Sequence, residues 1–493
     1  MKKWHYFFIS TFLLISCSAN NTSLFLSSSG CEHLIVIDQR KEPTCYEIGL
    51  TEGKHCAKCN LIIEKQEIIP PSHNYKLTNI YLEKVKDITK AGDFKCARCQ
   101  NKIIKEISFE DINIPIITIE GNLNTINKEN KTKLKITYQD KKKLESIVTF
   151  KLQGSSSLAY PKKNYNIQFL DENGDKQKVL LNENWSKQSK YCLKANYIDY
   201  SQARNVVSAK IYGDIVHYRN LNDEINNLVN GGAIDGYPVL IYNNDNYLGL
   251  YTLNIPKDKW LFNMKDKKPN SILMAKEWSK SCFLQEEINE NFSNGWEVEY
   301  CGNDDINSLR NNFNKVINEI KNNDFSHIYV DRAIDSMLYT MLIGARDNYS
   351  KNILWASFDG SNFLPSVYDL DATWGINWDG KSFSKYNEYL INDILSSWNC
   401  NELWKKLFQN YPLKIASSYF SLREGPLKLD NILNKYNSFI SSIDKVIYQT
   451  ESKKWPNIPS QKENNIVQIE SYIVQRINLF DKYFKEMENA YNK

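Results

Sequence analysis

Residues 331–375 carry the pattern that most constrains the fold, an amphipathic helix followed by a polar bend and a hairpin. Apolar residues recur every three to four positions from Ile334 to Ala345, and the polar bend Arg346–Asn352 ends that helix. Two strands, 353–358 and 363–368, then flank the turn at Asp359. Because a hairpin returns to the end where it began, the segments before and after it are expected to meet.

Acidic and amide side chains occupy both of those segments. Asp347 and Asn352 precede the predicted hairpin, and Asp369 and Asp371 follow it. Mg²⁺ favours a few carboxylate oxygens together with phosphate oxygens and water. The sequence therefore predicts a magnesium site at this end of the hairpin.

A glycine and three serines form the predicted tip of an upstream hairpin. Ser155 and Ser156 lie in this tip, and Lys162 and Lys163 follow it. Backbone N–H groups at such a tip can cradle an anion, with a lysine as counter-charge. A plain solvated turn has the same composition. Alternating side chains predict the surrounding strands, at 134–138, 147–152 and 165–169.

Two more cations lie where a predicted strand leads into a predicted helix. Lys194 falls on the strand, and Arg204 falls in the first turn of the helix, which is expected to start near Ser201. A surface lysine and a salt-bridged arginine would explain both residues without a functional role. A further hairpin is predicted at 238–253.

The order of these motifs resembles the spore coat protein H (CotH) kinase family, an atypical and divergent protein-kinase fold. The resemblance covers residues 150–375 and includes a D-x-x-x-x-N spacing, a hairpin and an aspartate motif, the order found in protein kinases. The motifs that carry it are GSSS, KK, LKANYIDYSQARN, GLYTL, DNYSKN and YDLDATWG.

The resemblance implies an α+β, kinase-like domain over 109–395. Apolar helical stripes after residue 396, interrupted near Trp455, predict a helical C-terminal subdomain over 396–493. The implied activity is transfer of the ATP γ-phosphate to Ser or Thr of a coat or surface protein, with Mg²⁺ as cofactor.

The resemblance also implies roles for individual residues. Asp347 would orient or deprotonate the acceptor hydroxyl, while Asn352, Asp369 and Asp371 would hold Mg²⁺. Either Lys194 or Lys162, together with Arg204, would contact the phosphates, with Lys163, Ser155 and Ser156 as further nucleotide-binding candidates. One departure concerns Asn254, which stands where the family usually has an acidic residue, so a Lys–Glu type of ion pair is in doubt.

Residues 31–108 form a cysteine-rich segment with two Cys-x-x-Cys pairs. Cys56–Cys59 and Cys96–Cys99 lie 40 residues apart, which indicates a tandem repeat. Two thiolates at this spacing can bind one tetrahedral zinc ion. Cys31, His33, Cys45 and His73 are candidates to complete the first site, and the expected ligands are Cys31, His73, Cys56 and Cys59.

The second pair has no comparable upstream Cys or His unless it shares His73, so its site is expected to be incomplete. The segment resembles a short cysteine-containing repeat of surface proteins from Gram-positive anaerobes, whose role is structural or unknown. Disulfides compete with zinc as an interpretation because vicinal cysteines oxidise in secreted chains, and free thiols are a third alternative.

The N-terminus has the features of an export signal. A charged start precedes a short apolar run at 6–15, and Ser16-Cys17 then resembles a bacterial lipobox. We expect a signal peptide over 1–16, lipidation of Cys17 and a polar tether over 17–30, which would anchor the protein outside the cytoplasm. An ordinary secretory signal with an incidental cysteine is the alternative.

Charge and histidine content exclude several classes of function. A net charge of +4 lacks the basic excess that a dedicated nucleic-acid binder needs. Only His217 and His327 lie beyond the cysteine-rich segment, so Ser-His-Asp or histidine-based metal catalysis has little to build with. Two rivals to a kinase remain, a non-catalytic surface protein that binds an envelope or host ligand and a glycosidase that uses Asp347 and Asp369.

Overall fold

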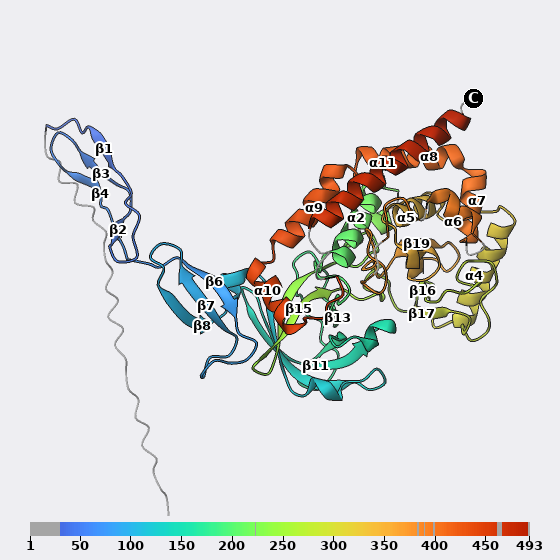
Figure 1. Ribbon diagram of the computed structural model, residues 1–493, viewed down its shortest axis with the longest axis horizontal. Coiled ribbons are helices and arrows are strands. Elements are labelled where there is room, and N and C mark those ends of the chain that lie inside the picture. The colour runs from blue at the N-terminus through green and yellow to red at the C-terminus, as the bar shows by residue number, and fades with distance from the viewer. Residues whose placement is uncertain are drawn as a thin grey trace, which may run out of the picture. The chain divides into compact units, whose positions relative to one another are not determined.

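The computed structural model describes most of the chain, in two compact units. The described residues are 30–221, 223–381, 384–388, 390–397, 400–460 and 466–491. One unit contains residues 30–75 and 96–100, and the other contains 76–95 and the rest of the chain from 101 (Figure 1). The expected cysteine-rich segment 31–108 is therefore divided between the units. The predicted signal peptide, the tether up to residue 29 and Cys17 lie outside the described residues.

The cysteine-rich segment is built from small antiparallel strands. β1 (Ile35–Asp38), β3 (Gly53–Cys56) and β4 (Ile62–Glu64) form one sheet, and β2 (Gly49–Leu50) pairs with β5 (Ile68–Ile69). A second three-stranded sheet follows, formed by β6 (Tyr75–Ile80), β7 (Ala91–Cys96) and β8 (Lys102–Glu106). The starts of β1 and β6 lie 40 residues apart, as do the ends of β3 and β7, the same spacing as that of the two Cys-x-x-Cys pairs.

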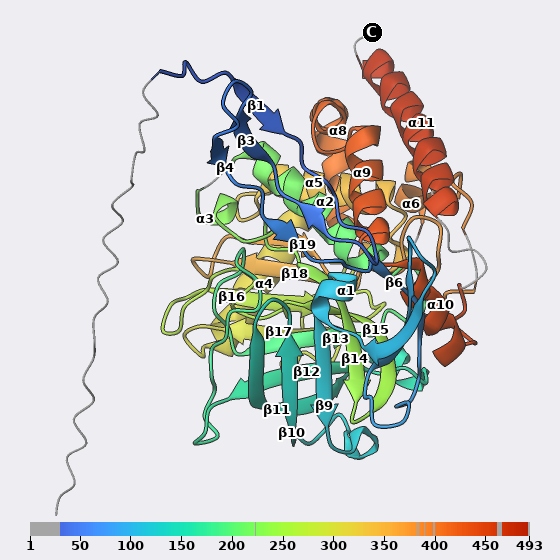
Figure 2. The same cartoon turned by 90° about the vertical axis from the view of Figure 1, so that its left-hand side faces the viewer.

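A closed seven-stranded barrel follows the repeats (Figure 2). Its order is β10-β11-β12-β13-β15-β14-β9, and all pairs are antiparallel except β14 with β9. The strands predicted from alternation are present within it. The barrel consists of β9 (Ile116–Glu120), β10 (Thr132–Gln139), β11 (Lys143–Gln153), β12 (Asn164–Leu170), β13 (Lys190–Lys194), β14 (Gly236–Asn243) and β15 (Asn246–Asn254), with the short helices α1 (Phe109–Ile112), η1 (Leu123–Thr125) and η2 (Ser156–Ala159) between strands or before them.

A four-stranded antiparallel sheet carries the hairpin singled out in the sequence. Its order is β17-β16-β18-β19, formed by β16 (Ser271–Ala275), β17 (Trp296–Cys301), β18 (Ile353–Ser357) and β19 (Leu364–Val367). The other described helices of the larger unit are α2 (Arg204–Arg219), α3 (Asp223–Asn226), α4 (Ile306–Lys321), α5 (Val330–Leu342), η3 (Arg346–Tyr349), α6 (Ile391–Ser396), α7 (Glu402–Asn410), α8 (Pro412–Glu424), α9 (Leu429–Ser441), α10 (Lys445–Lys454) and α11 (Ile466–Tyr491).

Helix α5 lies at the centre of the helical part. Every residue from Arg332 to Leu342 is buried, so this helix is enclosed on all sides rather than amphipathic as predicted. Helices α2, α8 and α11 and strand β19 pack around it. The polar face is accommodated because Arg219 of α2 forms a paired set of hydrogen bonds with Asp335, at 2.7 to 3.1 Å.

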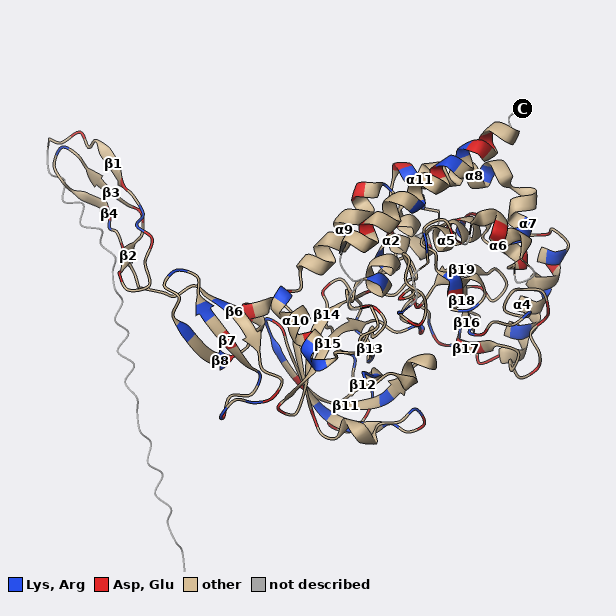
Figure 3. Cartoon of the chain, in the orientation of Figure 1, with Lys and Arg blue, Asp and Glu red and all other residues tan. Residues whose placement is uncertain are grey.

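Charged residues of both signs are interspersed along the surface helices (Figure 3). This mixture matches the small net charge of the sequence. Among the described helices, none is both long and apolar enough to span a bilayer.

Candidate functional site

The β18–β19 hairpin brings together the two polar segments that the sequence placed at its ends. Ile353 lies opposite Val367, and the backbone N–H of Tyr368 donates to the carbonyl of Asn352 at 3.1 Å. The backbone N–H of Asn352 donates in turn to Ala275 of β16 at 2.7 Å. Asp369 therefore follows directly from the strand end that is bonded to Asn352.

Asn348 fixes this junction from within the bend. Its buried side chain donates to the carbonyl of Tyr368 at 2.8 Å and to that of Asn352 at 3.2 Å. One amide group thus ties both ends of the hairpin to the loop that carries Asp347. Sequence reasoning assigned no role to Asn348, although an asparagine beside a predicted functional aspartate is a usable signal.

Two of the predicted metal ligands have left-handed backbone conformations. The φ angle is +58° at Asn352 and +54° at Asp369. Asn and Asp are the residues other than glycine that tolerate this region best. Such conformations persist where the surroundings over-determine them, and they cluster at functional sites.

Lys194 connects the barrel to this acidic end. It is the last residue of β13, and its Nζ lies 3.0 Å from Oδ1 of Asp369. The lysine side chain is 10% exposed and the aspartate 32%. Burial acts to lower the pKa of Lys194, but the carboxylates of Asp369 and Asp371 outweigh it and raise that pKa above its usual value. The lysine is therefore held as a cation facing both aspartates.

Asp371 lies in a concentrated negative field. Burial first, and then the charges of Asp369, Asp347 and Asp199, raise its pKa to about 8 against the opposing effect of Lys194. The ionised form of Asp371 is therefore unfavourable in this site, and a bound cation would stabilise it. Among the described residues these carboxylates do not gather three ligand atoms within 4.8 Å, so a magnesium ion would draw further oxygens from water or phosphate.

Two lysines that sequence reasoning did not select also belong to this region. Lys351 Nζ lies 2.8 Å from Oδ2 of Asp347, one helical turn earlier in the chain. Burial lowers the pKa of Lys257 to about 8, although Glu297 and Asp369 act to raise it. Lys257 contacts Glu299 and lies over the Tyr368 ring. Lys257 lies in a loop after β15, where no periodic pattern distinguishes it from other lysines of the sequence.

Two of the cations predicted to contact phosphate, Lys162 and Arg204, are used inside the fold instead. Lys162 and Glu451 form an ion pair of 2.6 Å with both side chains fully buried. Arg204 is also fully buried, and its guanidinium donates to Asp199 and to Gln468. Lys163 donates to the backbone carbonyls that follow the serine tip. The expectation for Lys162 and Arg204 is wrong, because the protein itself binds their donors in its interior, whereas the role of the partly buried Lys163 stays a prediction.

The serine tip is exposed and preshaped by a glycine. Ser155 and Ser156 are exposed, and Gly154 has φ of +111°. A β-carbon at Gly154 would come within 1.9 Å of the Ser157 hydroxyl, so this turn requires glycine. The tip continues to Tyr160, whose pKa is raised by burial and then by the charge of Asp371.

Asn254, which stands where the resemblance calls for an acidic residue, does not replace the missing charge. Its side chain is buried, and neither of its polar atoms has a hydrogen-bond partner among the described residues. Lys194 pairs with Asp369 instead. The ion pairs of the two candidate lysines are therefore Lys194 with Asp369 and Lys162 with Glu451, and Asn254 takes part in neither.

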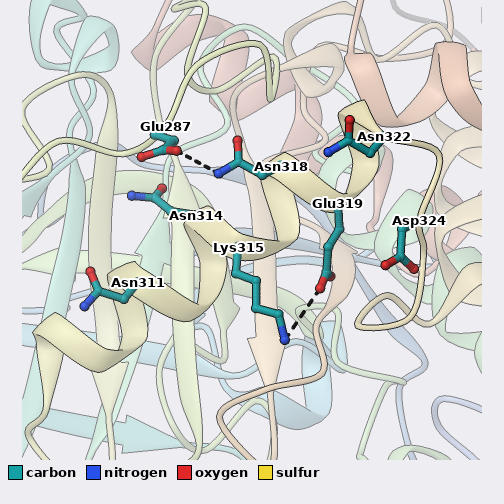
Figure 4. Close-up of a pocket in the computed structure, with 8 residues that line it drawn as sticks. All are labelled: Glu287, Asn311, Asn314, Lys315, Asn318, Glu319, Asn322 and Asp324. Atoms are coloured by element: carbon teal, nitrogen blue, oxygen red, sulfur yellow. Dashed lines mark hydrogen bonds and ion pairs between the residues drawn. The ribbon is translucent and has the colours of Figure 1, made fainter.

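A polar surface hollow lies elsewhere, along α4 (Figure 4). Its volume is about 570 Å³, and Asn318 and Lys315 on its wall bond to Glu287 and Glu319. None of the predicted site residues lines it. Several polar side chains of this hollow bond to one another. Its carboxylates form no cluster of possible metal ligands among the described residues.

The smaller unit contains two clusters of possible metal ligands. Cys31, His33, Cys56 and Cys59 form the first cluster; Cys45, His73, Cys96 and Cys99 form the second. The expected assignment of His73 to the first site is wrong, because His33 takes that position. The expectation of an incomplete second site is also wrong, because Cys45, 51 residues before Cys96, supplies its fourth possible ligand.

Comparison with known proteins bears on the larger unit. No curated protein matches the chain. The family model described as CotH kinase protein matches residues 150–479, more than half of the sequence. The match begins in β11, includes Lys194, Asp347, Asn352, Asp369 and Asp371, and continues through the C-terminal helices into α11. Those helices therefore lie within the family region, and the chain belongs to the CotH kinase protein family.

Proposed function

We propose that this protein is an atypical protein kinase that transfers the γ-phosphate of ATP to a Ser or Thr hydroxyl of a coat or surface protein. The observation that carries the proposal is the Lys194–Asp369 ion pair, set beside Asp371, Asp347 and Asn352 at one end of the β18–β19 hairpin. A basic group facing several carboxylates matches the charge pattern of a metal–triphosphate complex.

The donor set fits a magnesium ion. The oxygen ligands that Mg²⁺ prefers are present on Asp369, Asp371 and Asn352. The pKa of Asp371 is strongly raised, and a nearby dication would lower it. When bound, the ion would neutralise charge on the transferred phosphoryl group. Lys194 would hold phosphate oxygens next to Asp369.

Asp347 is the proposed acceptor-side residue. Its carboxylate is half-buried and contacts Lys351, and Asn348 anchors the bend that carries it. From this position Asp347 would orient the acceptor hydroxyl and take its proton, while Lys351 would offset negative charge on the phosphoryl group. Phosphoryl transfer depends mainly on positioning of the reactants and on charge neutralisation. Asp347 would supply the first and Lys351 part of the second.

Autophosphorylation of the full chain with labelled ATP and Mg²⁺ tests the proposal. Asp347→Ala should reduce incorporation by about 100-fold or more, within the range seen when a positioned acid–base group is lost. Asp331→Asn is the matched control, because Asp331 forms only an exposed ion pair with Lys414 at the start of α5. Equal incorporation by wild type and Asp347→Ala would contradict the assignment.

Thermal stabilisation by ATP with Mg²⁺ separates binding from catalysis. At a hundredfold excess over Kd, a single binding site adds about 2.7 kcal/mol of stability. Stabilisation without phosphate transfer would favour the rival function, a non-catalytic surface protein. No stabilisation and no transfer would remove the nucleotide from the proposal altogether.

A further inference from the structure

The two cysteine–histidine clusters repeat one arrangement at a constant spacing. His33, Cys56 and Cys59 of the first cluster correspond to His73, Cys96 and Cys99 of the second, each 40 residues later. The backbone repeats with them. Ala57 donates to the carbonyl of Leu34 at 2.9 Å, and the residues 40 positions later, Ala97 and Asn74, form the same bond at the same distance.

Each Cys-x-x-Cys pair lies in the same tight turn. The N–H of Asn60 donates to the carbonyl of Cys56 at 2.8 Å, and that of Gln100 donates to Cys96 at 3.0 Å. Asn60 and Gln100 both have positive φ, at +58° and +67°. Two copies of one turn therefore present two thiol groups and one imidazole in the same way.

Distances between the side-chain atoms distinguish a metal site from a disulfide. The sulfur atoms are 3.9 Å apart for Cys31 and Cys56 and 3.5 Å apart for Cys45 and Cys96. The sulfur-to-Nδ1 distances are 3.5 Å for Cys59 with His33 and 3.3 Å for Cys99 with His73.

These separations match the edges of a tetrahedron around zinc. With Zn–S of about 2.3 Å and Zn–N of about 2.0 Å, tetrahedral geometry gives edges of about 3.8 Å between sulfurs and about 3.5 Å between sulfur and nitrogen. A disulfide would require sulfurs about 2.05 Å apart. In each cluster all four ligand atoms lie within 4.8 Å of one another.

We propose that each cluster binds one Zn²⁺ ion through three cysteines and one histidine. A closed set of four protein ligands is the form of structural zinc sites, which contribute directly to folding. Small β-sheets with little buried apolar surface need such support: Ile35 and Ile62 are largely exposed on the sheet of the first repeat. This inference is independent of the proposed kinase function.

The two sites differ in their fourth ligand. Cys31 precedes His33 by two positions, but Pro71 stands at the corresponding place in the second repeat. Cys45 supplies the missing thiol from within the first repeat, and it is buried together with Cys96. Arg98 supports this arrangement, since it donates to the carbonyl of Pro43 at 2.6 Å and to that of Ser72 at 2.7 Å.

The sites should therefore release metal at different rates. His33 and Cys59 of the first site are exposed, whereas none of the four ligands of the second site is. A chelator should remove zinc from the first site before the second.

Elemental analysis of the purified full chain tests the proposal. Wild type should contain two zinc ions per chain, and Cys59→Ser and Cys99→Ser should each lose one. Cys301→Ser, in β17 of the larger unit, is the control and should keep both. X-ray absorption of the wild type should give three sulfur neighbours near about 2.3 Å and one nitrogen near about 2.0 Å per zinc.

Specific outcomes overturn the proposal. Absence of zinc together with loss of free thiols at the Cys-x-x-Cys pairs, measured by alkylation under denaturing conditions without reductant, would establish disulfides. Bound iron in place of zinc would overturn the identity of the metal. A single zinc that survives Cys59→Ser but not Cys99→Ser would eliminate the first site.

Discussion

Asp371 gives the site a pH dependence whose sign follows from its pKa. The pKa is raised to about 8 in the folded protein, from an ordinary value of about 3.9. The folded state therefore holds this proton more tightly than the unfolded state does. Between about pH 4 and pH 8, the unfolded chain gives up the proton first, so the group lowers stability as the pH rises.

Binding of Mg²⁺ with ATP should consequently strengthen from pH 6 to pH 8, because the cation competes with the proton. The thermal shift on adding both should be larger at the higher pH. Asp371→Asn should stabilise the ligand-free protein at pH 8, because it removes a carboxylate that the folded state disfavours, and it should abolish this pH trend. Asp331→Asn should leave both unchanged. A trend that persists in Asp371→Asn would assign it to another group.

Lys194 should be needed for phosphate transfer, and another cationic side chain at this position should replace it only in part. Lys194→Met leaves Asp369 without its counter-charge, so we expect phosphate transfer to fall by about 100-fold or more. Lys194→Arg should recover only part, because a planar guanidinium does not reproduce an ammonium point charge. Steady-state rates at saturating ATP would measure both, with circular dichroism to verify folding. Unchanged rates for Lys194→Met would contradict the assigned role.

At the residue scale, the sequence marks the carboxylates and Lys194 as candidates, and the structure pairs Lys194 with Asp369. The sequence does not reveal the partners of the other cations. Residue type and order mark a candidate such as Asp347, because the chemistry requires it there. Burial of Lys162 against Glu451 joins residues 289 positions apart, and nothing local in the sequence announces such a pair. The same limit explains why His73 was assigned to the wrong cluster.

At the scale of elements, α10 packs on strand β15 of the barrel, and a buried ion pair lies in this contact. Lys162 of the segment before β12 meets Glu451 of α10, and the glutamate also accepts the N–H of Leu250 in β15 at 2.7 Å. Lys162 further donates to carbonyls of Ala195 and Leu250. Removing one partner leaves an uncompensated buried charge, which is strongly destabilising.

Lys162→Met should therefore lower the free energy of unfolding by about 3–5 kcal/mol. The double variant Lys162→Met/Glu451→Leu should recover much of that loss, since an apolar pair can substitute for a buried ion pair. Denaturant melts of the two single variants and the double variant supply the thermodynamic cycle. Independent, additive losses would show that the two side chains do not interact.

Elements with a strong local period were predictable. The hairpin of β18 and β19, the strands β10, β11 and β12, and the helix α5 follow from the spacing of apolar residues. Barrel closure was not predictable, because it depends on the parallel pairing of β9 with β14, more than a hundred residues later in the chain. The enclosure of α5 likewise depends on helices from the C-terminal part.

At the scale of the whole molecule, the C-terminal helices belong to the fold of the candidate site. Arg476 of α11 is fully buried and donates to the carbonyls of Met341 and Leu342 at the end of α5. Gln468 accepts a hydrogen bond from Arg204 at 2.5 Å. The helical segment predicted over 396–493 thus packs on the part that carries the candidate site and lies in the same compact unit.

A chain truncated after residue 395 should fail to fold. It would lose the caps on the carbonyls of Met341 and Leu342 and expose the apolar surface of α5, which α8 and α11 cover. Solubility, near-ultraviolet circular dichroism and resistance to protease, compared with the full chain, would measure this. A cooperative melt from the truncated chain would contradict the prediction.

The place of Cys45 makes the tandem repeat an unequal one. The second cluster takes this cysteine from the first repeat, whereas the first cluster takes all four of its residues from its own. Deletion of the first repeat would therefore remove Cys45, one of the four residues of the second cluster. Loss of the second repeat would leave the first cluster with all four of its residues, so the two deletions have unequal consequences.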